Sequence, residues 1–584
     1  MDWILLVLTG CTMPPDLMIR PEPGPPPVLE CPAGLSGDEP IASKILEEAR
    51  SAIAGDPSVI LLENGEDALL TRIHLLRAAR SNVDIQVFIY TYDRTGKFFF
   101  SELLKAAGRG VRVRLLVDHI YSPGISPAEY ASLATAHANL KIKVFRPIAN
   151  DAVAKGSDFT QGTFMRFSSM NYRMHNKVML VDGALAIVGG RNIQDAYYDR
   201  DPKLTFLDRD IIVNGPVCQD IHASFEEFWE HKDSFHATQM SDIRRSLKKG
   251  QRIDPGLVLG ETDPTFTEVT LSADLWDITD GNPSLKSWPV EEIVFLADVP
   301  VKATRFANPW KQNPFEEVFA LMEEADEEIL MQTPYAVMED KTYRRLRKIR
   351  KKKPEVRFRI STNSLSSSDH FYVSGIALKQ RRMQIEGLRT ELYLIKPIPG
   401  DIGEYVPGYE NLLQQASNSS NSNPFSLSQA ATRFCVHGKS LIIDRKLSLV
   451  GSHNFDPRSV YLNSECLVLI RDSAFSRHLA EVVDKAIHPR NSWVVAPRNL
   501  PPIIGDLNGL LARISSNLPM FDLWPIEQVS CYELKEGLEP LSPYDSDFHS
   551  RYRDVGPIPG LDIGMEQVRI QLIRAFGGPM TPLM

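Results

Sequence analysis

Two copies of one short pattern carry the residues of this chain that could do chemistry. Each copy reads histidine, any residue, lysine, four further residues and aspartate: His175, Lys177 and Asp182 in the first copy, and His437, Lys439 and Asp444 in the second. In both copies a glycine follows the histidine by 14 positions and an asparagine by 17: Gly189 and Asn192 in the first, and Gly451 and Asn454 in the second. Matched copies of this kind indicate an internal repeat.

The residue types in this pattern suit the transfer of a phosphate ester. Residues two apart on a strand face the same side, so His175 is expected to point with Lys177, and His437 with Lys439. If the two halves pack about a pseudo-twofold axis, both pairs meet in one cleft. Two imidazoles and two ammonium groups are compatible there only around an anion, and phosphate is the natural candidate.

Such a cleft would support a two-step reaction that needs no metal and no other cofactor. One neutral imidazole attacks phosphorus and forms a phosphohistidine. The other imidazole, protonated, donates to the leaving alcohol and then accepts the proton of an incoming alcohol or water. The two lysines would neutralise the non-bridging oxygens, and two asparagines, Asn192 and Asn454, would add hydrogen-bond donors.

Each histidine also needs a group that orients its other ring nitrogen. Two carboxylates open apolar, strand-like runs downstream of the motifs, Asp210 in the first half and Glu465 in the second. We interpret Asp210 as the partner of His175, and Glu465 as the partner of His437. The alternative is that both are surface carboxylates at the starts of strands.

Alternating strand and helix patterns surround both motifs. Apolar, strand-like runs occur at 84–90 and 110–118 in the first half and at 328–334 and 356–361 in the second, with helical patterns at 99–107 and 342–352. This order predicts an α/β fold of two pseudo-twofold-related repeats, each a mostly parallel or mixed sheet flanked by helices, with the active site at their interface.

The predicted domain boundaries follow the repeat. They are 41–255 for the first repeat, 256–299 for a connector rich in proline, glycine and aspartate, 300–490 for the second repeat, and 491–584 for a C-terminal extension. Polar loops at 151–169 and 416–429 precede the motifs and are either lids or plain solvent loops.

The first 40 residues differ from the rest of the chain. A short apolar run at 3–8 leads into Leu8-Thr9-Gly10-Cys11, which resembles a bacterial lipobox with Cys11 as the acylated residue, and a proline-rich tether follows. We expect residues 1–40 to be a lipoprotein signal and tether. The alternative is a chance match, because no basic residue precedes Arg20.

The composition favours lipid over nucleic acid as the partner. The net charge of the 584-residue chain is −9, whereas proteins that hold nucleic acid usually carry a basic surface. No apolar run reaches the roughly 18 residues that span a bilayer. The six cysteines include no CxxC pair, so a zinc ribbon and a thioredoxin-like site have no support.

The duplicated motif resembles the signature of the phospholipase D superfamily over roughly residues 45–490. The segment 451–459 with Asn463-Ser464-Glu465 resembles the bacterial cardiolipin synthase branch of that superfamily. Three further segments resemble its C-type members: 189–193 with Asp195-Ala196-Tyr197-Tyr198, Asp208-Arg209-Asp210, and 362–365 with Asp369.

The resemblance implies transfer of a phosphatidyl group to the free alcohol of phosphatidylglycerol, with phosphatidylglycerol or phosphatidylethanolamine as the donor. It implies that His175 is the nucleophile and His437 the acid and then the base. It also implies orienting roles for Asp210 and Glu465, and structural roles for the motif aspartates Asp182 and Asp444. Together with the lipobox, it implies a bacterial cell membrane location, peripheral or lipid-anchored, on the periplasmic face.

Several alternatives remain open at this point. A hydrolase, either a phospholipase D or a nuclease, would use the same residues with water as the acceptor, and a non-catalytic lipid-binding protein would share the scaffold. A basic run at 344–353 fits anionic lipid headgroups, nucleic acid or a solvated helix face. Residues 510–524 fit either a membrane interface or packing on the catalytic body.

Overall fold

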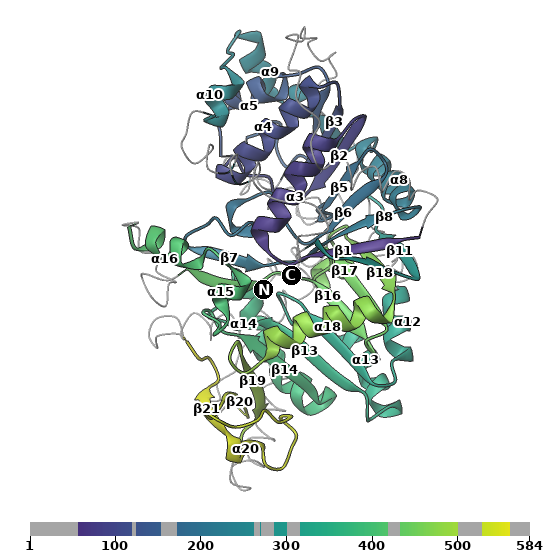
Figure 1. The fold of residues 1–584 in the computed structure, drawn as a ribbon, viewed down its shortest axis with the longest axis vertical. Coiled ribbons are helices and arrows are strands. Elements are labelled where there is room, and N and C mark those ends of the chain that lie inside the picture. The colour runs from purple at the N-terminus through teal and green to yellow at the C-terminus, as the bar shows by residue number, and fades with distance from the viewer. Residues whose placement is uncertain are drawn as a thin grey trace, which may run out of the picture.

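The computed structural model describes residues 56–119, 124–153, 172–261, 285–300, 316–418, 432–499 and 528–560, together with Val269 and Ser272. The expected lipobox with Cys11, the run at 510–524 and most of the two polar loops lie outside these residues. In Figure 1 the first half of the chain lies at the top and the second half below it.

The first half forms a mixed sheet that has nine strands within the described residues, in the order β10-β1-β8-β6-β5-β2-β3-β4-β9. Its strands are β1 (Ser58–Leu62), β2 (Asn82–Val87), β3 (Arg112–Asp118), β4 (Leu140–Phe145), β5 (Val178–Val181), β6 (Leu185–Gly189), β8 (Asp210–Asn214), β9 (Ser234–His236) and β10 (Ser287–Pro289). Its main helices are α3 (Gly65–Ala78), α4 (Arg94–Gly108), α5 (Pro127–Ala134), α8 (Val217–Trp229), α9 (Ser241–Lys248) and α10 (Pro255–Leu259).

The second half forms a sheet of ten described strands in the order β11-β18-β17-β16-β12-β13-β14-β19-β20-β21. Its strands are β11 (Glu292–Ala297), β12 (Glu328–Gln332), β13 (Arg357–Asn363), β14 (Thr390–Ile395), β16 (Ser440–Ile443), β17 (Leu447–Gly451), β18 (Cys466–Arg471), β19 (Ser492–Pro497), β20 (Val529–Leu534) and β21 (Tyr552–Gly556). Its helices include α12 (Glu316–Glu324), α13 (Asp340–Lys352), α14 (Phe371–Arg382), α15 (Ile402–Tyr405), α16 (Tyr409–Asn418), α17 (Pro457–Tyr461), α18 (Ser473–Ile487) and α20 (Phe548–Arg551).

The two sheets repeat one topology. Each sheet contains three parallel strands in which the middle strand pairs with the other two: β2-β3-β4 in the first half and β12-β13-β14 in the second. The other neighbouring pairs within these two sheets are antiparallel. The expected α/β fold with two repeats is therefore confirmed, and within it the sheets are mixed.

The segments predicted to lie outside the two repeats also contribute strands to the sheets. Within the stretch expected as a connector, β10 pairs with β1 of the first sheet and β11 with β18 of the second. In the C-terminal extension, β20 pairs with β19, and β21 continues the edge of the second sheet.

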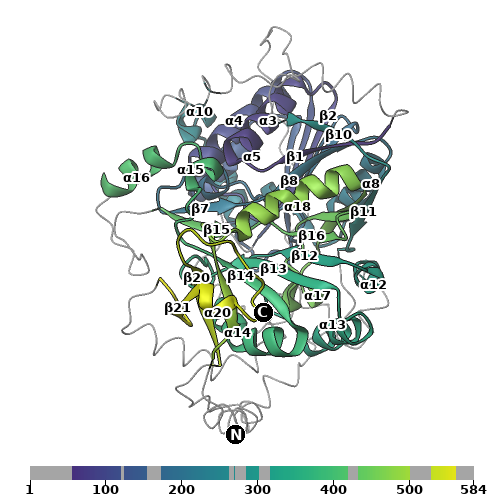
Figure 2. The same cartoon turned by 60° about the horizontal axis from the view of Figure 1, so that its bottom comes forward.

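A shared apolar core joins the two halves. It contains buried residues of both motif strands, such as Leu180 of β5 and Ile442 of β16, and residues of α8 and α18, such as Ile221 and Leu479. Figure 2 shows α18 crossing the molecule with α8 at one end. The strands β5 and β16 are short and buried along their whole length, and apart from Ser440 all their residues are apolar, which suits strands covered on both faces.

Candidate active site

The two histidine–lysine pairs lie at the entrances to equivalent strands. His175 and Lys177 immediately precede β5, and His437 and Lys439 immediately precede β16. The prediction that these residues lie on the strands themselves is therefore wrong by a few positions. All four side chains are buried at the interface of the two halves.

Each histidine is held by a carboxylate from the opposite half of the chain. Nδ1 of His175 lies 2.8 Å from Oε2 of Glu465. Nδ1 of His437 lies 2.5 Å from Oδ2 of Asp208. The predicted pairs, Asp210 with His175 and Glu465 with His437, are both wrong, because the histidines exchange carboxylates across the interface and the carboxylate of the first half is Asp208.

Backbone hydrogen bonds between the halves explain this exchange. The amide of His175 donates to the carbonyl of Ser464, the residue before Glu465, at 2.9 Å. On the other side, β15 (Arg433–Val436) pairs in parallel with β7 (Leu204–Leu207). The amide of His437 continues that pairing and donates to the carbonyl of Leu207, the residue before Asp208, at 2.8 Å. Each histidine segment is thus bonded directly to the segment that carries the carboxylate of the other half.

Strand register shows that Asp208 is the counterpart of Glu465. The motif glycine Gly189 pairs with Asp210, whereas its counterpart Gly451 pairs with Leu467. Because Asp210 is equivalent to Leu467, the residue two positions earlier, Asp208, is equivalent to Glu465.

Asp210 belongs to a separate buried ion cluster. Its Oδ2 accepts from Arg72 of α3 at 2.8 Å and from Arg191 at 3.1 Å. Both guanidinium groups are buried. This cluster ties the loop that carries Asn192 to α3, and it leaves Asp210 away from the imidazoles.

Glycine at position 190 allows Asp208 to reach the site. A Cβ on Gly190 would lie 2.1 Å from Oδ1 of Asp208, which is closer than nonbonded atoms can approach. At Gly438, inside the second motif, the nearest atom to an added Cβ is Oε1 of Gln332 at 3.3 Å.

The electrostatics of the site favour two neutral imidazoles in the free protein. Burial and the nearby Lys177, opposed by Glu465, together lower the pKa of His175 to about 4. Burial and Lys439 likewise lower the pKa of His437, against the attraction of Asp208.

The pKa values of the neighbouring lysine and carboxylates are also shifted. Burial lowers the pKa of Lys177 to about 7, with Glu465 opposing. Burial alone would raise the pKa of Glu465 and of Asp208, but the histidines and lysines beside them bring both well below the usual range. The site therefore holds two ionised carboxylates beside two histidines and a lysine whose pKa values are lowered. Because a bound anion would favour the protonated forms of these bases, the site suits an anionic ligand.

Each lysine turns back toward its own motif histidine. Nζ of Lys177 donates to the carbonyl of His175 at 2.6 Å. Nζ of Lys439 lies 2.8 Å from Nδ1 of His437 and also donates to the carbonyl of that residue. Both ammonium groups are thus fixed beside the imidazoles.

The two motif asparagines have different surroundings. Asn192 accepts from the amide of Ile89 at 3.0 Å and donates to the hydroxyl of Tyr197 at 2.8 Å. The carbonyl of Asn454 accepts from Thr333 at 2.5 Å, whereas its buried side-chain Oδ1 has no hydrogen-bond partner among the described residues. Asn454 is therefore the asparagine with unused hydrogen-bonding capacity.

Further polar residues, to which the sequence analysis assigned no role, hold the catalytic segments. Ser452 and Ser459 donate to the two oxygens of Glu465 at 2.6 and 2.8 Å.

Asp118, the last residue of β3, accepts from the amide of Met174, next to His175, at 2.9 Å. Asn363, the last residue of β13, bonds both the amide and the carbonyl of Val436, next to His437, at 2.7 and 2.8 Å.

The motif aspartates lie away from the histidines and hold turns. Asp182 accepts from the amides of Arg80, Ser81 and Asn82. Asp444 accepts in the same way from three successive amides, those of residues 326–328. Both have left-handed backbones, with φ of 53° and 50°. These contacts support the structural roles that the resemblance implied.

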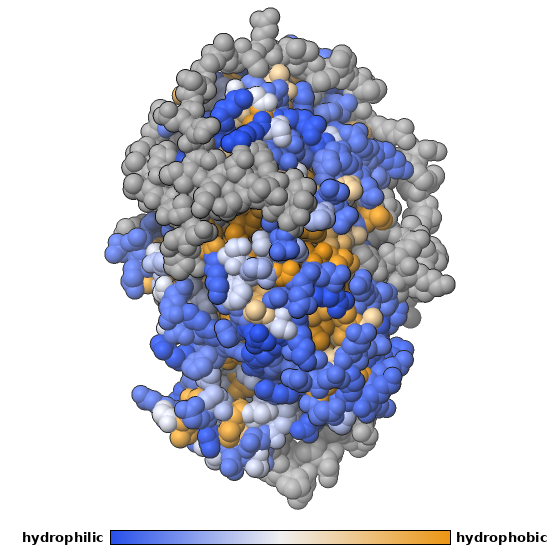
Figure 3. Space-filling view, turned by 45° about the vertical axis from the view of Figure 1, so that its right-hand side comes forward, coloured by the Kyte–Doolittle hydropathy of each residue, from blue (hydrophilic) through white to orange (hydrophobic). Residues whose placement is uncertain are grey.

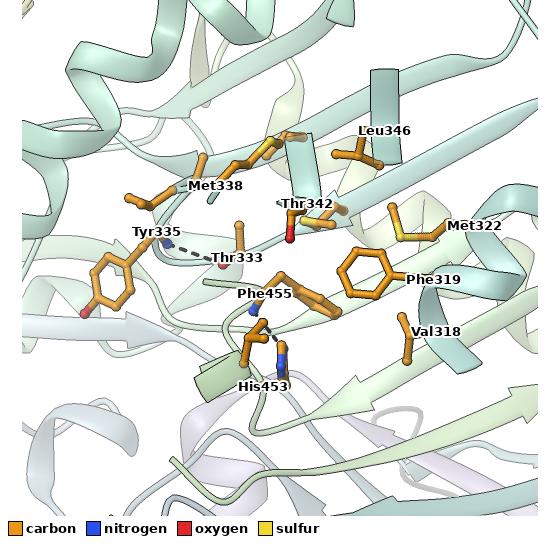
Figure 4. A pocket seen from close by; sticks show the side chains of 15 residues that line it. Val318, Phe319, Met322, Thr333, Tyr335, Met338, Thr342, Leu346, His453 and Phe455 are labelled. Carbon is orange, nitrogen blue, oxygen red and sulfur yellow. Dashed lines mark hydrogen bonds between the residues drawn. The ribbon is translucent and has the colours of Figure 1, made fainter. Parts of the chain in front are cut away.

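An apolar pocket lies behind the second catalytic loop. It is lined by Phe319 and Val318 of α12, by Leu346 of α13, and by His453 and Phe455, which flank Asn454. Figure 4 shows these side chains converging on the pocket, with Nδ1 of His453 accepting from the amide of Phe455. The loop that carries Asn454 therefore has one polar side, toward Glu465, and one apolar side.

Two negative observations apply to the described residues only. Among them, no group of three or more histidine, cysteine, aspartate or glutamate side chains is placed to hold a metal ion. No helix in the described part of the chain has both the length and the apolar character needed to cross a bilayer.

Comparison with known proteins identifies the same two segments. A family model described as "Cardiolipin synthase, PLD-like domain" matches residues 72–229 and 318–487. Cardiolipin synthase C of Escherichia coli (strain K12) is 30% identical over 436 residues, covering 74% of this chain and 84% of that protein. An uncharacterized protein of Helicobacter pylori (strain ATCC 700392 / 26695) is 30% identical over 445 residues, 75% of this chain and 80% of that one. Among solved structures, phosphatidylserine synthase of Haemophilus influenzae Rd KW20 aligns with 80% of this chain and 98% of its own at 13% identity, with a TM-score of 0.47.

Proposed function

Because the chain belongs to the phospholipase D-like cardiolipin synthase family, we propose that it makes cardiolipin from phosphatidylglycerol and a second phospholipid. It is an enzyme of the phosphatidyltransferase class. The donor is phosphatidylglycerol or phosphatidylethanolamine, and the acceptor is the free hydroxyl of phosphatidylglycerol. The observation that carries the proposal is the pair of buried histidine–carboxylate contacts at one interface.

In the first step, Nε2 of His175 attacks phosphorus. Its Nδ1 is hydrogen-bonded to Glu465, which fixes the ring and stabilises the positive charge that develops on it. The bond from phosphorus to the headgroup alcohol breaks, and the leaving oxygen takes the proton from Nε2 of His437. A phosphatidyl-histidine and a free alcohol result.

In the second step, the roles of His437 reverse. The hydroxyl of phosphatidylglycerol gives its proton to Nε2 of His437, its oxygen attacks phosphorus, and the bond from phosphorus to His175 breaks. Asp208 holds His437 in both steps. Lys177 and Lys439 neutralise the non-bridging oxygens, and the side-chain nitrogen Nδ2 of Asn454 donates to the same phosphoryl group.

The arrival of the substrate supplies the proton that His437 needs. In the free protein, burial and Lys439 disfavour the imidazolium. A bound phosphodiester adds a negative charge beside both lysines and both histidines, which favours their protonated forms. The enzyme thus becomes competent as an acid when the anion binds.

The direct test uses the purified full-length chain on phosphatidylglycerol vesicles, with lipids and released alcohols followed by mass spectrometry. The proposal predicts cardiolipin and free glycerol in equal amounts, and no product from His175→Ala or His437→Ala. Adding phosphatidylethanolamine tests the donor, because its use releases ethanolamine. Accumulation of phosphatidic acid without cardiolipin would show that water is the acceptor, and the proposed transfer would be wrong.

We also propose that the enzyme works at a bacterial membrane surface, attached through an acylated Cys11 on the periplasmic face. Helix α13 supports a surface contact. Of its basic run, Arg345, Arg350 and Lys353 are engaged by acidic side chains or carbonyls of the protein. The other cations are exposed at helical spacing on one face: Arg344, Arg347, Lys348, Lys351 and Lys352.

Each such cation contributes about 1 kcal/mol near an anionic bilayer. Figure 3 shows, on one side of the molecule, apolar surface gathered at the middle between hydrophilic areas.

Flotation with phosphatidylglycerol and with phosphatidylcholine vesicles tests the contact of α13 with an anionic membrane. Reversal of Lys348 and Lys351 to glutamate should weaken binding to the anionic vesicles, whereas the same reversal of exposed Lys248 and Lys249 at the end of α9 should not. Equal effects would contradict a role for α13.

A further inference from the structure

A tyrosine of the first half lies against the catalytic histidine of the second. Tyr197 ends a short 3-10 helix (Asp195–Tyr197) and is buried. Its ring stands almost perpendicular to that of His437, with 5.0 Å between centroids and 82° between planes. Its hydroxyl lies 3.5 Å from Nε2 of His437. This nitrogen is the one that exchanges a proton with substrate, because Nδ1 is engaged by Asp208.

The surrounding hydrogen bonds direct the hydroxyl proton of Tyr197 toward the site. Oδ1 of Asn192 accepts from the amide of Ile89, which orients the side-chain amide so that its nitrogen donates to the Tyr197 oxygen at 2.8 Å. The phenolic oxygen is therefore an acceptor toward Asn192. The same oxygen lies 3.5 Å from Nε2 of His437, so its hydrogen can donate to that nitrogen or to an oxygen bound there.

Tyr197 is also firmly held. Its carbonyl accepts from Nε of Arg191 at 3.2 Å, and Arg191 is bonded in turn to Asp210. Its ring packs on Phe206 at 4.6 Å between centroids. A donor fixed in this way loses little entropy when it binds a reacting atom.

Among the described residues, the aromatic ring that contacts the other histidine carries no hydroxyl. The ring that stands edge-on to His175 is Phe88, at 4.9 Å and 69°. The pseudo-twofold symmetry is thus broken where the two histidines need different chemistry. A hydroxyl lies beside the proposed acid and base, and a plain aromatic ring lies beside the proposed nucleophile.

We propose that Tyr197 is a catalytic residue that donates a hydrogen bond to the alcohol oxygen at phosphorus. This inference rests on the proposed function. In the first step, the leaving oxygen breaks from phosphorus, takes the proton of His437 Nε2 and accepts a hydrogen bond from Tyr197 while its charge develops. In the second step, the acceptor oxygen occupies the same position, gives its proton to Nε2 and keeps the hydrogen bond. Tyr197 itself is not consumed and transfers no proton.

A comparison of leaving groups tests this role. Release of glycerol from phosphatidylglycerol needs stabilisation of a developing alkoxide, whereas release of 4-nitrophenolate from bis(4-nitrophenyl) phosphate needs almost none. Tyr197→Phe should lower the glycerol-releasing rate about 10–100-fold, as for loss of one transition-state donor. The first-turnover burst of 4-nitrophenolate should change less than about 3-fold, because a single neutral hydrogen bond contributes little to that step.

Tyr198→Phe is the matched control, since it removes the hydroxyl of the adjacent buried tyrosine and should change neither rate. Asn192→Asp is a second variant. Its new carboxylate would accept the Tyr197 proton and turn it away from the reacting oxygen, so the same selective loss is expected with Tyr197 in place.

Three outcomes would overturn the inference: equal loss with both substrates in Tyr197→Phe, no loss with either substrate, or the same selective loss in Tyr198→Phe. If the intact chain releases no glycerol, the proposed function fails. If the intact chain is active and selectivity is absent, only the role of Tyr197 fails.

Discussion

Nδ1 of His175 lies 2.8 Å from Oε2 of Glu465, a residue 290 positions further along the chain. The equivalent contact in the pseudo-twofold-related half joins His437 to Asp208, 229 positions apart in the chain. Neither half therefore contains a complete histidine–carboxylate pair. The active site exists only when both halves are folded and joined, and the backbone bonds at Ser464 and Leu207 set the geometry of that joint.

The first prediction separates the two neighbouring aspartates. Asp208→Asn removes the charge that orients His437 and should lower kcat about 1,000-fold or more, by analogy with the loss of an orienting carboxylate in a hydrolytic triad. Asp210→Asn should leave kcat of the folded enzyme within a few-fold of the original. It should instead lower the free energy of unfolding by about 3 kcal/mol, because Arg72 and Arg191 lose their buried partner.

Steady-state kinetics and thermal unfolding of the two variants check this. A normal kcat in Asp208→Asn, or a large loss of kcat in a well-folded Asp210→Asn, would restore the local pairing that the sequence suggested.

The second prediction concerns glycine. Gly190→Ala places a Cβ where Asp208 now lies, so the carboxylate must move and activity should fall at least about 100-fold, as expected when a catalytic group is misplaced by an ångström. In Gly438→Ala the added Cβ meets the end of the Gln332 side chain at 3.3 Å and Arg209 at 3.6 Å, which neighbouring side chains can accommodate, and the corresponding residue of the first motif is Asn176. The Gly438 variant should keep activity within a few-fold, and equal losses in the two variants would count against this account.

The third prediction concerns the motif aspartates. Asp182→Ala and Asp444→Ala each leave three backbone amides without their acceptor, which should cost roughly 1–3 kcal/mol of folding free energy. Because neither carboxylate contacts a histidine, kcat per folded molecule should stay close to that of the original. Active-site titration combined with chemical denaturation distinguishes lost stability from lost chemistry. A stable but inactive Asp444→Ala would show a catalytic role.

The fourth prediction is a proton taken up when an anion binds. In the free enzyme, the pKa of Lys177 is about 7 and that of His437 is depressed, so both are partly deprotonated near neutral pH. A bound anion raises both pKa values, so protons move from solvent to protein. Sulfate serves as the probe because it does not titrate near pH 7. Calorimetry in two buffers of different ionisation enthalpy measures the uptake.

The uptake should decrease in Lys177→Met and in His437→Gln. Binding of sulfate with no proton uptake, or with release of protons, would contradict the assigned protonation states.

The sequence was sufficient for the repeat, the α/β class and the residues of the motifs, because the apolar runs and matched spacings are local signals. The strands predicted at 84–90 and 356–361 correspond to β2 and β13.

The pairing of the carboxylates was not a local signal. Asp208 and Asp210 both precede an apolar strand, and spacing from His175 does not distinguish them. The choice depends on register against Gly189 and on bonds to the other half, and both are tertiary. The sequence placed Tyr197 in a family-like segment but predicted no role for it, because its contact with His437 joins residues 240 positions apart.

Direct capture of the intermediate tests the central claim. The enzyme is mixed with bis(4-nitrophenyl) phosphate, quenched in alkali, digested and analysed by mass spectrometry, using His437→Ala to slow breakdown of the intermediate. The account predicts a 4-nitrophenyl phosphoryl group on His175 in this variant and none anywhere in His175→Ala. An adduct on His437 in the intact enzyme, or release of 4-nitrophenolate by His175→Ala at the normal rate, would contradict the assignment of His175 as the nucleophile.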